Sequence, residues 1–94
     1  MEQTIKLVFK NDLTKLAGNA FGKHTYETQV KELIDFNNAI IFEFPEQVDR
    51  VASSFVQGFF DEIVNEIGVH GVEQQINFVS SISDLKDFVL ENLE

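Results

Sequence analysis

The sequence contains no cysteine, so neither a disulfide framework nor thiolate chemistry is available to this protein. It has a single proline, Pro45, and no run of apolar residues approaches the length needed to cross a membrane. The first ten residues, MEQTIKLVFK, lack the basic start and the apolar run of a signal peptide. Together these absences predict a cytoplasmic protein with no membrane partner.

Signatures of catalytic and metal sites are also missing from the sequence. The only histidines, His24 and His70, lie far apart, and no HxH, HxxxH or HExxH spacing occurs. Gly18 and Gly22 are four residues apart, but neither a GxGxxG pattern nor a Gly-Lys-Ser/Thr ending is present. There is no Gly-x-Ser-x-Gly elbow for a nucleophilic serine. We therefore expect no enzymatic activity, no cofactor and no metal site.

Basic residues are scarce, since seven Lys or Arg stand against sixteen Asp or Glu and give a net charge of −9. The excess lies mainly in residues 51–94, where Lys86 is the one basic residue against eight acidic ones. Such a field repels nucleic acid phosphate, so we expect no direct binding to nucleic acid. It is typical of a solvated acidic surface. It would also attract a basic partner, or imitate nucleic acid toward a protein that binds it.

The chain has 94 residues, 44% of them hydrophobic, with ten Phe, and this predicts one globular domain over residues 1–94. Alternating apolar side chains predict a strand over residues 4–9. A turn signal, Asn11-Asp12, precedes a short second strand over residues 13–17. Residues 18–22 are then expected to break regular structure in a turn that positions Phe21 toward the core.

A helical period follows over residues 24–36, and the two asparagines at 37–38 are expected to end this helix. Glu27 precedes Lys31 by four residues, which is the favourable order for a surface ion pair along a helix. Residues 39–44, AIIFEF, predict a buried central strand that ends at Pro45, because proline cannot donate a hydrogen bond within a sheet.

The segment VASSFVQGFFDEIVNEIG, residues 51–68, predicts the main helix. Either Ser53 or Ser54 can cap its start, and Gly68 is expected just past its end. Its apolar face contains Phe55, Val56, Phe59, Phe60, Ile63, Val64 and Ile67. Its polar side contains Gln57, Asp61, Glu62, Asn65 and Glu66.

After this helix we expect a short connection over residues 69–71, which carries His70, and a strand over residues 74–79. Ser81 or Ser83 is expected to cap a final helix, with Ser81 and Asp84 forming a capping box. The apolar face of that helix contains Leu85, Phe88, Val89 and Leu93. The alternation of strands and helices predicts an α/β fold, bordering on α+β, with a mainly parallel or mixed sheet. If two copies pair, we expect residues 4–9 and Phe60 at the interface.

The segments GNAFGKHTYE, IIFEF and VASSFVQGFFDEIVNEIG resemble the STAS-like family of small prokaryotic and phage proteins. That family is similar to the STAS domains of anti-sigma factor antagonists, and the resemblance extends from about Ile5 to Leu93. It implies a mixed sheet of four to five strands, with about three helices packed largely on one face. It also implies a role in protein–protein regulation rather than in the turnover of a substrate.

In the antagonists, the turn before the matching helix has an Asp-Ser-Ser-Gly pattern whose first serine is phosphorylated by a partner kinase. Ser53 matches that serine and Ser54 matches the second, which makes Ser53 a candidate phosphorylation site. Ala52 and Phe55 stand where the pattern has Asp and Gly. The alternative is that the two serines only cap the helix.

Two functional hypotheses follow. In the first, the protein is a regulatory module that docks through the start of the main helix on a GHKL-type ATPase, a kinase or another regulator. In the second, it is an acidic inhibitor from a phage or mobile element that imitates nucleic acid, for example toward a CRISPR effector. The residues expected to contact the partner in the first hypothesis are Ser53, Ser54, Gln57, Asp61, Glu62 and Glu66.

Overall fold

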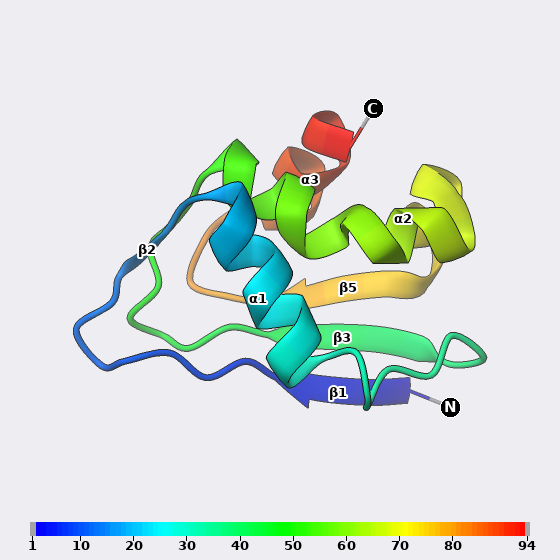
Figure 1. Cartoon of the computed structure of the whole chain (residues 1–94), viewed down its shortest axis with the longest axis horizontal. Coiled ribbons are helices and arrows are strands. Elements are labelled where there is room, and N and C mark those ends of the chain that lie inside the picture. Colours follow the sequence, from blue (N-terminus) through cyan, green and yellow to red (C-terminus); the bar gives the residue numbers. More distant parts are fainter. Residues whose placement is uncertain (1, 94) are drawn as a thin grey trace.

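The structure is a computed structural model that describes residues 2–93 as five short strands and three helices (Figure 1). The strands are β1 (Glu2–Lys6), β2 (Lys15–Leu16), β3 (Ala39–Glu43), β4 (Arg50–Val51) and β5 (Ile76–Val79). The helices are α1 (Asn19–Gln29), α2 (Ser53–Gln75) and α3 (Leu85–Leu93). Within residues 2–93, no helix is both long enough and apolar enough to cross a membrane.

The strands form two parallel sheets. The larger sheet has the order β1-β3-β5, and the two-residue strands β2 and β4 pair with each other. The expected α/β class is confirmed, whereas a single sheet of four to five strands is not. After β3 the chain passes through Pro45, which has no N–H to continue a ladder, so β4 forms separately from the larger sheet.

One face of the larger sheet carries the core. Ile5, Phe42 and Phe78 align across the three strands in register, and their side chains pack beneath the helices. The residues of the other face alternate with them, and most of these are exposed to solvent. The central position predicted for the strand at residues 39–44 is confirmed, because β3 pairs with both β1 and β5.

The first half of the chain differs from expectation around α1. The helix begins at Asn19 and includes Gly22, so the predicted break over residues 18–22 is wrong. Gly22 is retained inside the helix because the backbone of α2 lies directly against it. Phe21 is half-buried against Phe9 and Phe55, as predicted.

Helix α1 also ends earlier than predicted, at Gln29, and residues 30–36 form turns and loop rather than helix. The predicted ion pair between Glu27 and Lys31 is wrong, because Lys31 lies beyond the last helical residue and its ammonium pairs with Glu62. The asparagines at 37–38 therefore precede β3 without ending a helix.

The strands before α1 lie close to the predicted positions but are shorter. β1 ends at Lys6 rather than at residue 9. The reason is local: the side-chain amide of Gln29 accepts a hydrogen bond from the Val8 N–H (2.7 Å) and donates one to the Val8 carbonyl (2.8 Å), in place of a neighbouring strand. β2 lies within the predicted residues 13–17 and pairs with β4.

Helix α2 begins at Ser53, as predicted, but it does not end at Gly68. Gly68 adopts φ 72° and interrupts the helix, which then resumes and continues to Gln75. The predicted connection over residues 69–71 and the first two residues of the predicted strand 74–79 are therefore helical. A glycine in this conformation can end a helix, but here the chain only changes direction.

The predicted helix caps are also wrong. The residue before α2 is Ala52, and among the described residues 2–93 no side chain caps this helix. The hydroxyl oxygen of Ser54 instead accepts a hydrogen bond from the N–H of Gly18 (2.9 Å), which ties the start of α2 to the start of α1.

The start of α3 likewise lacks the predicted capping box. Ser81 donates its hydroxyl hydrogen to the carbonyl of Glu46 (3.0 Å), and Asp84 has φ 59° just before the helix. Within residues 2–93, no hydrogen bond links the hydroxyl of Ser81 or Ser83 to the first turn of α3. The apolar face is as predicted, since Leu85 and Val89 are buried and Phe88 and Leu93 are half-buried.

Phenylalanine rings fill the space between the sheet and α2. Phe60 is 2% exposed and lies against Phe42 and Phe78 from the sheet. The prediction that Phe60 contributes to a dimer interface is therefore wrong, because its ring belongs to the core of one chain. β1 does lie at an edge of its sheet, as predicted. Pairing of two copies through that edge stays a prediction.

Candidate interaction site on helices α1 and α2

Two glycines allow α1 and α2 to pack against each other at unusually short distance. A Cβ atom added at Gly58 would overlap the backbone carbonyl of Asn19, and one added at Gly22 would overlap the backbone of Phe55 and Phe59. Because a glycine has no Cβ, each helix can approach the other until backbone touches backbone. The polar side chains that flank this crossing are thereby brought within reach of each other.

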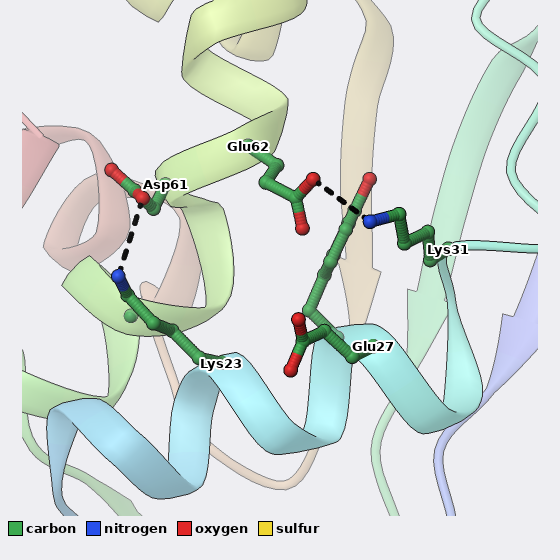
Figure 2. A pocket seen from close by; sticks show the side chains of 7 residues that line it. Lys23, Glu27, Lys31, Asp61 and Glu62 are labelled. Carbon is green, nitrogen blue, oxygen red and sulfur yellow. Dashed lines mark ion pairs between the residues drawn. The ribbon is translucent and has the colours of Figure 1, made fainter.

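Two ion pairs link α2 to α1 and to the turn that follows α1 (Figure 2). The Lys23 Nζ lies 3.6 Å from Asp61 Oδ2, and the Lys31 Nζ lies 3.3 Å from Glu62 Oε1. In Figure 2, Glu27 extends from α1 toward the space between the two pairs. All four paired side chains are about half exposed, and pairs of this kind typically stabilise a protein by about 0–1 kcal/mol each. Another charged group can therefore replace one partner of either pair at a small cost in free energy.

Two adjoining hollows lie between α2 and the wall formed by α1 with the segment after it, and they share Tyr26, Lys31 and Glu62. The first has a volume of about 240 Å³, and Lys23, Glu27, Gly58 and Asp61 complete its lining. The second has a volume of about 370 Å³, and Ile34, Phe36, Asn65 and Glu66 complete its lining. We call the two hollows together the α1–α2 groove. It combines carboxylates, two lysines, aromatic rings and an aliphatic side chain.

Tyr26 forms part of both hollows. It is 4% exposed, and its ring packs edge-on against Phe59 at a centroid distance of 6.1 Å. Burial raises the pKa of its phenol above the ordinary value of 10.0, and the negative charges of Glu62 and Glu66 raise it further. The phenol is therefore neutral throughout the physiological pH range.

This shift gives a direct test of the groove, because Tyr26 is the only tyrosine of the chain and there is no tryptophan. We expect absorbance at the tyrosinate band of the native protein to rise at a higher pH than for a tyrosine in a short peptide. Glu66→Gln should lower this midpoint, while it stays above 10.0 because burial is the larger cause. In the unfolded chain the phenol titrates near 10.0, so the unfolding free energy should fall as pH rises above this value.

The control for this titration is Glu91→Gln on α3, which removes the same charge outside the groove lining. A native-state midpoint at the value of a peptide tyrosine would contradict the described environment of Tyr26. An equal shift in Glu66→Gln and Glu91→Gln would show that the net charge alone is responsible.

The structure places the six predicted contact residues along one helix in two groups. Ser53 and Gln57 are exposed on the first turns of α2, whereas Ser54 is half-buried and held by Gly18. The second group lies in the α1–α2 groove: Asp61, Glu62 and Glu66. Asp61 and Glu62 are paired with lysines of the same chain, so their charges are partly compensated before any partner binds.

The residues that sequence reasoning missed come from α1 and the turn after it. They are Lys23, Tyr26, Glu27 and Lys31, which form the other wall of the groove. The glycines Gly22 and Gly58 could have indicated that these residues lie close to α2. An isolated glycine within a helical pattern weakens the helix, so two of them suggest a close approach between two segments.

The histidines do not contribute to this site. His70 is exposed and lies 3.8 Å from Glu73 on the second segment of α2, and His24 is exposed on α1. Within residues 2–93, no three His, Asp or Glu side chains are grouped so that they could hold a metal ion. A scan against protein-family models, a search of curated proteins and a search of solved structures each find no match to this chain.

Proposed function

We propose that this protein is a non-enzymatic regulatory module that binds another protein through the start of α2. One observation carries the proposal: Ser53 and Gln57 are exposed on the first turns of a helix whose opposite side is fully buried. Phe55, Phe59 and Ile63 anchor that buried side in the core. Polar side chains at the tip are therefore presented from a rigid element, which is how a docking site gains precision.

The resemblance to STAS-like proteins supports this role and suggests the kind of partner, a GHKL-type ATPase, a kinase or another regulator, in the cytoplasm of a prokaryote or of a phage-infected cell. Ser53 is the candidate phosphorylation site. A phosphate there would meet the free amides and the positive end of α2. Two exposed basic residues belong to the strands near this helix start. Arg50 lies on β4, which directly precedes α2 in the chain, and Lys15 is its partner in register on β2.

A second candidate function is the acidic inhibitor that imitates nucleic acid. The observation that favours it concerns Lys86, the only basic residue after Arg50. Its ammonium donates to the Glu73 carbonyl (2.8 Å) and to Asn77 Oδ1 (3.0 Å). Within residues 2–93, no ion pair involves Asp84, Asp87 or Glu91. The carboxylates near α3 are therefore free of direct ion pairs within the described residues, which favours a surface that presents negative charge to a partner.

Affinity capture from the native host, with the immobilised protein and a series of salt concentrations, tests the two functions. Gln57→Arg and Ser53→Asp should abolish capture of the regulator at the tip. Gln74→Arg is the matched control, because it makes the same charge change at another exposed position of α2. Phe55→Ala is unsuitable as a probe, since that side chain is only 1% exposed and its loss would disturb the core.

The regulatory module is supported if capture is lost in the tip variants and kept in Gln74→Arg. In that case capture should also be only modestly sensitive to salt. Capture that weakens steeply with salt and is competed by DNA or RNA would support the acidic inhibitor instead. Equal capture by the native protein and the tip variants would refute docking at the start of α2.

A further inference from the structure

We propose that the larger hollow of the α1–α2 groove receives an arginine side chain of the partner protein. This inference rests on the proposed role in protein binding and specifies the chemistry of the partner. The hollow, of about 370 Å³, falls within the range of about 300–1,000 Å³ that is typical of ligand pockets. It lies along α2 beyond the exposed tip at Ser53 and Gln57, so one partner segment could contact both.

The lining of this hollow suits the long stem of an arginine. Ile34 and Phe36 are half-buried and pack against the core, and together with the ring of Tyr26 they form an apolar wall. A basic side chain buries its methylene groups along such surfaces while its charged head stays near water. The guanidinium can also stack on an aromatic ring, which an ammonium does less readily.

The charges at the rim complement a cation. The groove is lined by four carboxylates, Glu27, Asp61, Glu62 and Glu66, and by two lysines. Because the lysines pair with Asp61 and Glu62, Glu27 and Glu66 keep their negative charge without an ion pair within residues 2–93. A guanidinium between Glu62 and Glu66 would gain charge-assisted hydrogen bonds, which are stronger than neutral ones.

Tyr26 gives a second and independent indication of a ligand. Its side chain is more than nine-tenths buried, yet within residues 2–93 no group makes a hydrogen bond with its hydroxyl. That oxygen remains accessible to solvent, since no enclosed polar side-chain atom within residues 2–93 lacks a partner. Tyr26 lines both hollows of the groove. A guanidinium N–H can therefore take the place of a water molecule as the donor to this hydroxyl.

Lys31 competes with the expected arginine side chain for Glu62. Its ammonium pairs with Glu62 at the junction of the two hollows, where it neutralises one of the carboxylates that would hold the guanidinium. Both side chains are about half exposed, so little free energy is lost when the pair opens. Removal of the Lys31 charge should therefore strengthen binding, in the opposite direction to removal of a carboxylate.

The test uses a fluorescein-labelled hexapeptide that contains two arginines and no tyrosine, with fluorescence anisotropy at low ionic strength as the readout. Matched peptides carry citrulline or lysine in place of arginine. We expect Glu66→Gln and Glu62→Gln each to weaken binding of the arginine peptide about fivefold, which corresponds to about 1 kcal/mol. Lys31→Met should tighten binding severalfold, and Glu91→Gln on α3 should change it little. The fluorescence of Tyr26 in the unlabelled complex reports directly on the groove.

The inference is overturned if the citrulline or the lysine peptide binds as tightly as the arginine peptide, or if the arginine peptide does not bind. It is also overturned if Glu91→Gln weakens binding as much as Glu66→Gln, because net charge would then be sufficient. A failed peptide test with host capture that still depends on Gln57 would remove this inference and leave the proposed function intact. If the arginine peptide binds but host capture is unchanged in the tip variants, docking at the start of α2 would be refuted and this inference would stand.

Discussion

Gly58→Ala is expected to lower the free energy of unfolding by about 3 kcal/mol, the upper part of the range for overpacked sites. In an isolated helix the same substitution would be stabilising by about 1 kcal/mol, because alanine is the better helix former. The sign reverses here because the new methyl group would lie 2.9 Å from the carbonyl carbon of Asn19 and closer still to its oxygen. Backbone atoms of α1 cannot move aside as a flexible side chain could, so the two helices must separate.

Urea unfolding followed by circular dichroism measures this effect. Gln57→Ala is the control, because it places alanine at the neighbouring, exposed position of the same helix. The control should be neutral or slightly stabilising. Gly22→Ala should behave like Gly58→Ala, since a Cβ there would lie 2.7 Å from the Phe59 nitrogen. A Gly58→Ala protein as stable as the native one would show that α1 and α2 are not in backbone contact.

Phe59→Ala should have an effect of similar or larger size, about 3–5 kcal/mol, because a fully buried ring is replaced by a cavity. Phe59 is 0% exposed, and its ring lies 5.2 Å from that of Phe42, 5.0 Å from that of Phe60 and 6.1 Å from that of Tyr26, between centroids. It therefore joins the sheet, α2 and the floor of the groove in one cluster.

Since domains of this kind are stable by only about 5–15 kcal/mol, Phe59→Ala could leave little folded protein. Phe59→Leu keeps most of the volume and should show a smaller loss in the same urea experiment. Leu33→Ala is the surface control, because Leu33 is 60% exposed and its truncation should change stability by less than about 0.5 kcal/mol. A loss in Phe59→Ala no greater than in Leu33→Ala would contradict its central place in the core.

Much of the fold was predictable where apolar side chains recur with a clear period. The strand β3 and the buried side of α2 were found correctly, because Phe42, Phe55 and Phe59 stand in uninterrupted patterns of strand and helix. The start of α1 was not, because Gly18 and Gly22 suggested a turn. Helix propensity is a weak guide when a neighbouring helix needs a residue without a side chain.

The end of α2 shows the same limit. Gly68 does adopt the positive φ that often ends a helix, so the local reasoning about this residue was correct. The chain nevertheless continues as helix, and the buried side chain of Val72 anchors the added segment in the core. Burial of that segment outweighs a local stop signal, and a sequence alone does not show which neighbour will be available.

The candidate site was likewise predicted only in part. Its acidic wall was predicted, because Asp61, Glu62 and Glu66 fall on the polar side of an obvious helix. Its basic wall was not, because Lys23 and Lys31 are distant in sequence and meet those acids only when α1 lies across α2. The hydroxyl of Ser54 was misjudged for the same reason, since it binds the Gly18 N–H rather than its own helix.

By itself, the sequence determined the class of the fold, the acidic charge, the central strand and the exposed tip at Ser53 and Gln57. These depend on composition and on short-range periodicity, which do not require knowledge of distant neighbours. Only the tertiary structure decided that the strands divide into two sheets, that Gly22 and Gly58 bring two helices into backbone contact, and that Tyr26 opens into a groove between them. Those features depend on which surfaces meet, and that choice is made by the packing of the whole chain.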